Sequence, residues 1–517
     1  MTTAALVLHD TYLDSVLLLG LTRTMADVDG VEWSAALMGT PPNLETLRAE
    51  GVDAGDLAGV AANDLVLAAR GRHRGPTDAA LALARTQAHD GVAGGRTATR
   101  APGESRPRTL EEAAALVDAN VAVISVPGPY ATLEAHKALT SGLHVLLFSD
   151  NVSLAAEVGL KERAAGLGRL VMGPGAGTAM LGGTGLGFAN AVRPGGRVGV
   201  LAAAGTGAQE VMALLDRWGP GASQVVGLGG RDLSEAVGGR AARLALELLA
   251  ADPASEALLL VSKPPARQVA AAVLAAAPTT KPLVAALVGL SGDLEVPSGV
   301  TLATSLEGGA LAAVDLLGTR RPDLGPPTDW VLDRRCASLE PGRRAVRGLF
   351  SGGTLCYESI VLLSRFLGPV HSNTPLRKDW GLPAPAGAHV CLDLGEEEFT
   401  RGRPHPMIDP EARAERIVAA GSDRDTAVVL IDVVLGYGSH PDPASVLAPL
   451  CAGLTARPGG PAVVAYVLGT GTDPQGYEAQ RQRFEAAGCL VPETAARATL
   501  LAAALAGRRP ELAEAAA

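Results

Sequence analysis

The chain has 517 residues, a mass of 52.3 kDa and a formal charge of −10, from 44 Lys and Arg against 54 Asp and Glu. Its 47% hydrophobic and 19% charged residues exclude a wholly disordered protein, and at roughly 100–200 residues per domain it holds several domains. The acidic balance and the 3% aromatic content leave neither a basic surface nor stacking side chains for nucleic acid. We therefore expect no nucleic-acid partner.

The cysteines and the N-terminal segment exclude two further classes. Five cysteines lie far apart in the C-terminal part without a Cys-x-x-Cys pair, so we expect neither a zinc site nor a disulfide framework, and no bound metal. The first twenty residues lack a basic region of the signal-peptide type, and no apolar run reaches the ~18–20 residues that cross a bilayer. These features predict a cytoplasmic protein without membrane contact.

The first 90 residues predict an N-terminal α+β domain. Apolar runs and alternation indicate strands, and 3.6-residue periodicity indicates helices. In chain order we expect strand 4–8, helix 12–27, strand 31–38, helix 43–51, strand 64–69 and helix 77–89. Residues 91–108 are rich in Gly, Pro, Arg and Ser, which is typical of a linker.

From residue 109 strands alternate with helices, which favours parallel sheets because parallel neighbours need crossover connections. We predict a Rossmann-like domain at 109–178, a second α/β domain at 190–312 and a third at 343–517. The segment 318–344, rich in Pro and Arg, is expected to be a linker. The fold class is thus α/β, with several doubly wound parallel-sheet domains of the Rossmann-like or flavodoxin-like kind behind the N-terminal α+β domain.

An internal duplication links the last two domains. VGVLAAAGTGAQEVMALL (198–215) matches VRGLFSGGTLCYESIVLL (346–363), which places Glu210 on Glu358. Two copies of one α/β unit usually pack face to face around a pseudo-twofold axis.

Each copy carries a glycine-rich turn between an apolar strand and a helix. Free N–H groups at a helix start, together with the helix dipole, attract anions. If the copies face each other, both turns converge on one phosphate; the alternative is that they are ordinary strand-to-helix turns. The predicted phosphate-binding residues are Gly205, Thr206, Gly207, Ser351, Gly352, Gly353 and Thr354.

Charged residues gather after the strand that ends in LDLG. Open α/β sheets bind ligands at such strand ends, and Arg and His can hold a carboxylate or move a proton. A solvated loop with charges for solubility is the competing interpretation. The candidates are Arg401, Arg403, His405 and Asp409, with His440 after the next strand and Arg231 in the matching loop of the first copy.

These segments carry a family resemblance. Residues 109–148, 171–177 (VMGPGAG), 195–211 and 225–233 (VVGLGGRDL) resemble blocks of the succinyl-CoA synthetase α-subunit, and 346–363 and 390–440 resemble the CoA-ligase domain of its β-subunit. Joined behind a unit with TYLDSV (11–16) and MGTPPN (38–43), they are similar to the FdrA family of acyl-CoA-synthetase-like proteins.

The chain departs from the synthetases at three places. The loop that should carry their phosphorylated histidine corresponds to 287–309, which contains no histidine. The predicted linker occupies the place of the glycine-rich CoA turn, and the ATP-grasp domain is absent. We therefore expect no phosphohistidine relay and no certain cofactor, and the missing turn argues against CoA binding.

The FdrA resemblance implies a subunit of a carbamoyltransferase that interconverts oxamate and carbamoyl phosphate in purine (allantoin) catabolism. Its partners would be the other subunits of that complex and a small-molecule substrate, with phosphate or carbamoyl phosphate at the two turns. Arg403, His405 and Glu358 would be catalytic, and Arg231, Arg401 and His440 would bind substrate. Two alternatives stay open: an acyl-CoA ligase subunit whose nucleotide domain lies on a partner, and a non-catalytic scaffold subunit.

Overall fold

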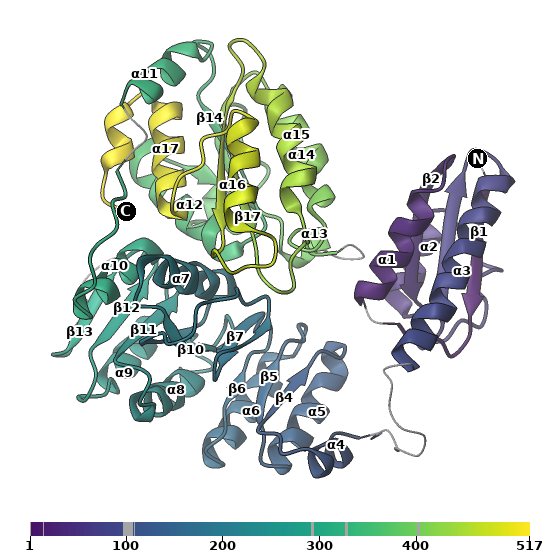
Figure 1. Ribbon diagram of the computed structural model, residues 1–517, viewed down its shortest axis with the longest axis horizontal. Coiled ribbons are helices and arrows are strands. Elements are labelled where there is room, and N and C mark those ends of the chain that lie inside the picture. The colour runs from purple at the N-terminus through teal and green to yellow at the C-terminus, as the bar shows by residue number, and fades with distance from the viewer. Residues whose placement is uncertain are drawn as a thin grey trace. The chain divides into compact units, whose positions relative to one another are not determined.

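The computed structural model describes residues 2–13, 15–96, 107, 109–290, 294–325, 329–400 and 404–517 (Figure 1). The chain divides into two compact units, one formed by residues 1–106 and one by residues 107–400 and 405–517. In these described ranges no helix combines the length and the apolar character needed to span a lipid bilayer.

The first unit is a three-stranded antiparallel sheet with helices on both faces. Its order is β1-β3-β2, so β3 is the central strand. Leu65 and Leu67 of β3 pack in the cluster under α1 and α3, and Val66 packs in the cluster under α2, because successive side chains of a strand point to opposite faces. All six elements expected from the sequence are present: β1 (Thr2–Leu8), α1 (Ser15–Ala26), β2 (Val31–Met38), α2 (Pro41–Ala49), β3 (Leu65–Gly71) and α3 (Arg74–Arg96).

The second unit begins with a three-stranded parallel sheet of order β4-β5-β6. Ala131, Ala135 and Ala138 line the buried face of its second helix and pack against Val145 and Leu147 of the central strand. Small side chains at this spacing let the helix lie close to the sheet. The elements are α4 (Leu110–Leu116), β4 (Val121–Ile124), α5 (Gly128–Thr140), β5 (His144–Leu147), α6 (Leu154–Gly166) and β6 (Val171–Met172).

Next comes a seven-stranded sheet of order β13-β12-β11-β9-β10-β7-β8. Strands β9 to β13 are parallel, whereas β7 pairs antiparallel with β10 and with β8. The sheet therefore starts at Thr178, before the predicted boundary at residue 190. Its elements are β7 (Thr178–Leu181), β8 (Thr184–Gly187), β9 (Val198–Ala202), α7 (Gly205–Trp218), β10 (Ala222–Gly227), α8 (Arg240–Ala251), β11 (Ala257–Ser262), α9 (Arg267–Ala275), β12 (Leu283–Leu287), β13 (Val300–Ala303) and α10 (Leu306–Leu316).

The last part is a five-stranded parallel sheet of order β15-β16-β14-β17-β18. Its main helices are α12 (Gly353–Leu367), α14 (Ala414–Ser422), α15 (Pro443–Thr455), α16 (Tyr477–Ala486) and α17 (Ala495–Gly507). The strands are β14 (Ala345–Phe350), β15 (Val370–His371), β16 (His389–Asp393), β17 (Thr426–Val434) and β18 (Ala462–Leu468). The α/β class with parallel sheets that the sequence predicts is confirmed.

One sequence-based expectation needs correction. The expected linker 318–344 contains the helix α11 (Asp329–Ser338), whose Leu332 and Cys336 are buried in the core because α11 packs on α17. Helix α8 begins at Arg240, directly after Gly238 and Gly239, which adopt positive φ angles.

One hydrophobic core spans the two duplicated halves. It joins Val200 and Val284 of the seven-stranded sheet with Phe350, Val428 and Tyr466 of the five-stranded sheet. Helices α7 and α10 of the first half contact α12 and α17 of the second. The face-to-face packing expected from the duplication is therefore found.

Candidate functional site

Two helix starts meet where the duplicated halves touch. Helix α7 begins at Gly205 after β9, and α12 begins at Gly353 after β14. The N–H of Thr354 donates to Oγ1 of Thr206 at 3.2 Å. A Cβ at Gly207 would lie 3.0 Å from the methyl carbon of Thr354, a tight contact that glycine avoids. The structure thus brings both predicted turns to one place.

The start of α12 is already occupied by an internal carboxylate. The N–H groups of Ser351 and Gly352 donate to the two oxygens of Asp432, each at 2.7 Å, and Ser351 Oγ donates at 2.9 Å. Asp432 is fully buried in β17, and its Oδ1 accepts from the buried Arg413 at 2.9 Å. A phosphate would compete with this carboxylate for two of the predicted donors.

The start of α7 is open. Gly205 is exposed, and a Cβ built on it would meet no atom within 4 Å. In the described part of the chain, the N–H groups of Gly205, Thr206 and Gly207 have no recorded acceptor, as is usual for a first helical turn. The two turns therefore differ just before the helix: Ser351 and Gly352 donate to a carboxylate, whereas Ala203, the counterpart of Ser351, donates to the carbonyl of Val261 at 2.9 Å.

Asp393, which the sequence analysis did not select, lies beside the start of α12. A Cβ on Gly353 would be 2.3 Å from its Oδ2, so this glycine is required by contact. Burial, opposed by the positive charge of Lys263, raises the pKa of Asp393 to about 6. The sequence signal for Asp393 is a carboxylate at the end of a mostly apolar strand (HVCLD).

His405 lies next to Asp393, and its geometry defines its tautomer. The backbone N–H of Met407 donates to His405 Nδ1 at 3.2 Å, so the proton of the neutral ring is on Nε2. Burial lowers the pKa of His405 to about 4, which keeps the ring neutral at pH 7. A Cβ built on Gly395 would lie 2.7 Å from His405 Nε2 and 3.3 Å from Asp393 Oδ1, so both side chains border this glycine. His405 is therefore a neutral hydrogen-bond donor.

Aromatic rings connect His405 to the three-stranded sheet. The ring centroids of His405 and Phe188 are 6.1 Å apart, and those of Phe188 and Phe148 are 5.8 Å apart. Phe148 follows β5 directly. The C-terminal edges of three sheets thus contribute to the same neighbourhood, as expected for a ligand site in open α/β sheets.

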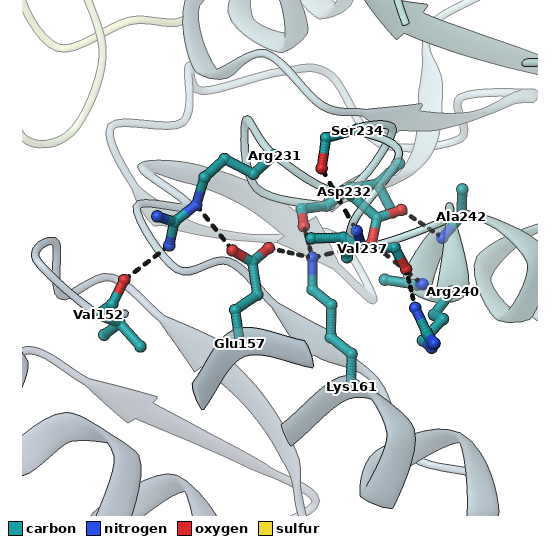
Figure 2. Close-up of polar contacts among 11 residues, drawn as sticks. Val152, Glu157, Lys161, Arg231, Asp232, Ser234, Val237, Arg240 and Ala242 are labelled. Atoms are coloured by element: carbon teal, nitrogen blue, oxygen red, sulfur yellow. Dashed lines mark hydrogen bonds and ion pairs between the residues drawn. The ribbon is translucent and has the colours of Figure 1, made fainter. Parts of the chain in front are cut away.

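Arg231 belongs to a different cluster, which joins α6 to the loop before α8 (Figure 2). Its Nε donates to Glu157 at 2.8 Å, and its Nη2 donates to the carbonyl of Val152 at 2.8 Å. The buried Lys161 contacts Glu157 at 2.9 Å and Asp232 at 2.8 Å. These contacts hold the three-stranded sheet against the seven-stranded one and give Arg231 a structural task.

Glu358 is buried six residues into α12. Its Oε1 accepts from the N–H of Leu306 at the start of α10, at 2.7 Å, while Glu210 accepts from the N–H of Ala495 at the start of α17, at 3.2 Å. Each of these duplicated glutamates thus caps the last helix of the opposite half. With 1% exposure, Glu358 cannot reach a substrate, so the geometry gives it a capping role in place of the predicted catalytic one.

Of the remaining predicted residues, His440 and Asp409 lie within the described ranges. His440 is joined to the His405 loop, because its N–H donates to the carbonyl of Met407 at 2.8 Å and its Nδ1 accepts from the N–H of Asp442. Arg401 and Arg403 lie outside the described residues, and Asp409 caps a short helical turn.

Across the described ranges, no group of three or more His, Cys, Asp or Glu side chains could hold a metal ion. The sequence agrees for the N-terminal unit, because no cysteine precedes Cys336.

Comparison with protein families gives two matches. Residues 349–505 match the CoA-ligase family, and residues 1–102 match the family described as AllF, heavy metal-associated domain. The second match implies a metal site that the residues do not fit, since soft metals prefer thiolate ligands and this unit has none.

One relative covers almost the whole chain. The uncharacterized protein YahF of Escherichia coli (strain K12) is 36% identical over 507 residues, which is 95% of this chain and 96% of YahF. Among solved structures, the dinucleotide-forming acetyl-coenzyme A synthetase 1 of Ca. Korarchaeum cryptofilum (apo form) is 15% identical, with a TM-score of 0.33 over 81% of this chain and 89% of its own. ATP citrate lyase of Methanothrix soehngenii is 20% identical, with a TM-score of 0.30 over 41% and 37%. These structural likenesses are too distant to inform function.

The CoA-ligase match corrects one expectation. The predicted carbamoyltransferase activity is wrong, because the family that covers 349–505, including α12 and the His405 loop, is described by CoA ligation. The acyl-CoA-ligase alternative fits this match better.

Proposed function

Because this chain belongs to the same family as YahF of E. coli, and its last domain is a CoA-ligase domain, we propose that it is an acyl-transferring subunit of a CoA-ligase-type enzyme. The proposed reaction exchanges an acyl group between a CoA thioester and inorganic phosphate. The observation that carries the proposal is that the starts of α7 and α12 meet beside His405. Helix α12 and His405 belong to the CoA-ligase domain, and α7 packs against it.

The proposed step needs no covalent enzyme intermediate. A phosphate oxygen forms a bond to the thioester carbonyl carbon, the C–S bond breaks, and the released thiolate takes up a proton. The free N–H groups of Gly205 to Gly207 would bind the phosphate. The Nε2–H of His405 would donate to the carbonyl oxygen as negative charge develops there.

A separate chain would supply the nucleotide step. The segment 287–309 contains no histidine that could carry a phosphoryl group, so the acyl phosphate would leave as product or pass to a partner subunit. The chain's own residues would then bind the acyl group and phosphate, and the released thiolate would take its proton from water.

A non-catalytic scaffold is the second candidate, and one observation favours it. Asp432 occupies the donors of Ser351 and Gly352 with its own carboxylate, as in a turn that has lost its ligand. The scaffold hypothesis predicts that neither CoA nor phosphate binds.

Release of CoA thiol tests the two candidates. The full chain would be incubated with acetyl-, propionyl- or succinyl-CoA and phosphate, and free thiol would be followed with a chromogenic disulfide. All five cysteines are buried, which keeps the protein's own signal slow. We expect phosphate-dependent release from the wild type and from Gly205→Ala, and loss of release in Gly205→Glu, whose carboxylate would repel phosphate at the open turn. No release and no thermal stabilisation by CoA would leave the scaffold as the function.

A further inference from the structure

Two of the five cysteines lie side by side in the core of the CoA-ligase domain. Cys451 belongs to α15, and Cys489 lies shortly after α16. Both pack in the same hydrophobic cluster, and their thiols are hydrogen-bonded to each other. Both are free thiols. The fold thus brings together two cysteines that the sequence places far apart, without a Cys-x-x-Cys pair.

Backbone contacts hold the two segments together on both sides of Cys489. Oγ1 of Thr455, in the last turn of α15, donates to the carbonyl of Ala487 at 2.5 Å. Cys451 is one helical turn before Thr455 and therefore lies on the same face of α15. On the other side, Leu490 makes two backbone hydrogen bonds of 2.9 Å to β18. The contact between the thiols is therefore fixed by the fold and does not depend on the side chains alone.

A cavity of about 340 Å³ borders one of the two thiols. It is lined by Cys489 together with Val491, Arg497 and Leu501. A water molecule occupies about 30 Å³ in the liquid, so a molecule of the size of hydrogen peroxide fits this space. Cys489 is 7% exposed and Cys451 is 0% exposed. An oxidant in the cavity therefore meets Cys489 first, and Cys451 is in place to react second.

The surroundings of Cys489 set how readily it reacts. Its hydrogen bond to Cys451 and its burial raise the pKa of the thiol, and the positive charge of Arg335 opposes them. The guanidinium of Arg335 is held beside the thiol, because its Nη2 donates to the carbonyl of Gly488 at 3.0 Å. Since the thiolate is the reactive form, we expect a slow reaction that needs sustained exposure to an oxidant.

We propose that Cys451 and Cys489 form a redox pair that a peroxide oxidises to a disulfide, which joins α15 to the segment beside β18. This inference goes beyond the proposed function and does not depend on it. The Cys489 sulfur attacks a peroxide oxygen, the O–O bond breaks, and a sulfenic acid and one water form. The Cys451 sulfur then attacks the Cys489 sulfur; the S–S bond forms, the S–O bond breaks, and the oxygen leaves as a second water with the Cys451 proton. Two thiols are oxidised and one peroxide is reduced.

The experiment treats the full chain with hydrogen peroxide, blocks the remaining thiols with N-ethylmaleimide in denaturant, and identifies linked peptides by mass spectrometry after proteolysis. In the wild type we expect the peptides of Cys451 and Cys489 to be joined, with a loss of about 2 Da that dithiothreitol reverses. Cys451→Ser should stop at a sulfenic acid on Cys489, which dimedone traps. Cys489→Ser should leave Cys451 reduced, because only Cys489 borders the cavity.

Cys336→Ser is the matched control. Cys336 is 8% exposed, close to the value for Cys489, but its Sγ donates to the carbonyl of Ala504 at 3.9 Å. This variant should form the same disulfide as the wild type.

Three results would overturn the inference. The first is no disulfide in the wild type at peroxide concentrations that convert free cysteine to cystine. The second is a disulfide between other cysteines, such as Cys356 and Cys391, in place of the proposed one. The third is oxidation of Cys451 in Cys489→Ser as fast as in the wild type. Should both serine variants fail to fold, the linked peptides of the wild type decide by themselves.

Discussion

The two glycine-rich turns have similar sequences but different hydrogen-bond partners, and single residues cause the difference. Ser351 and Gly352 donate their N–H groups to the carboxylate of Asp432, whereas Ala203, the counterpart of Ser351, donates to the carbonyl of Val261. Glycine has a different purpose in each copy. At Gly353 it avoids a collision with Asp393, and at Gly205 a side chain would meet open space.

We predict opposite effects of the same substitution at these two positions. Gly353→Ala should lower the melting temperature, because its Cβ would lie 2.3 Å from the buried Asp393 carboxylate. Gly205→Ala should leave it unchanged or raise it, since alanine favours the helical conformation. Thermal unfolding of both variants beside the wild type checks this prediction. Equal melting temperatures of the two variants would show that an alanine side chain fits at Gly353 in spite of the short distance to Asp393.

At the scale of elements, the halves are interlocked by reciprocal helix caps. Glu210 on α7 accepts from the start of α17, and Glu358 on α12 accepts from the start of α10. Tyr466 adds a hydrogen bond to Glu210 at 2.6 Å. Burial raises the pKa of Glu210 to about 7 and that of Glu358 to about 8, because a charged carboxylate is poorly solvated in the core.

These caps predict that stability falls as the pH rises. With a folded pKa of about 8 against the ordinary 4.5, Glu358 in the folded protein keeps a proton that the unfolded chain has lost. Its stabilising effect is complete below about pH 4.5 and is lost as the pH rises to about 8. Melting temperatures between pH 5.5 and 8.5 should therefore decline in the wild type and decline less in Glu358→Gln.

Glu256→Gln is the control for this series. Glu256 is exposed and paired with Arg197, which lowers the pKa of its carboxyl, so it does not titrate in this range. This variant should keep the wild-type slope. A slope in Glu358→Gln as steep as that of the control would mean that Glu358 is ionised in the folded protein.

At the scale of the whole molecule, buried charges hold the three-stranded sheet in the second unit. Lys161 of α6 lies between Glu157 and Asp232, and all three side chains are at most 1% exposed (Figure 2). Asp232 also accepts from the N–H groups of Ala241 and Ala242, which fixes the start of α8. Such a network positions two sheets relative to each other more specifically than apolar contact alone.

Lys161→Met should loosen this attachment. It leaves Glu157 and Asp232 buried without their shared cation, a loss on the order of 3–5 kcal/mol. We expect faster amide hydrogen exchange in β4, β5, β6 and α6, with β14 to β18 unchanged. Lys137→Met is the control, because its pair with Glu134 is half-exposed and contributes little. If exchange in β4, β5, β6 and α6 were no faster in Lys161→Met than in Lys137→Met, the network would not hold the three-stranded sheet in place.

Local pattern was enough to predict the α/β class, the duplication and the two glycine-rich turns, because strand and helix periodicity and turn chemistry depend on residues close in sequence. It failed where charges meet across the fold. Asp432 follows Ser351 by 81 residues, and no spacing in the sequence shows that its carboxylate fills the turn. The sequence did not predict helix α11, because its segment is rich in Pro and Arg, and packing on α17 stabilises it more than its own helix propensity does. Only the tertiary structure decided that Glu358 caps a helix and that Lys263 faces the opposite half, because electrostatic compensation is set by distance in space.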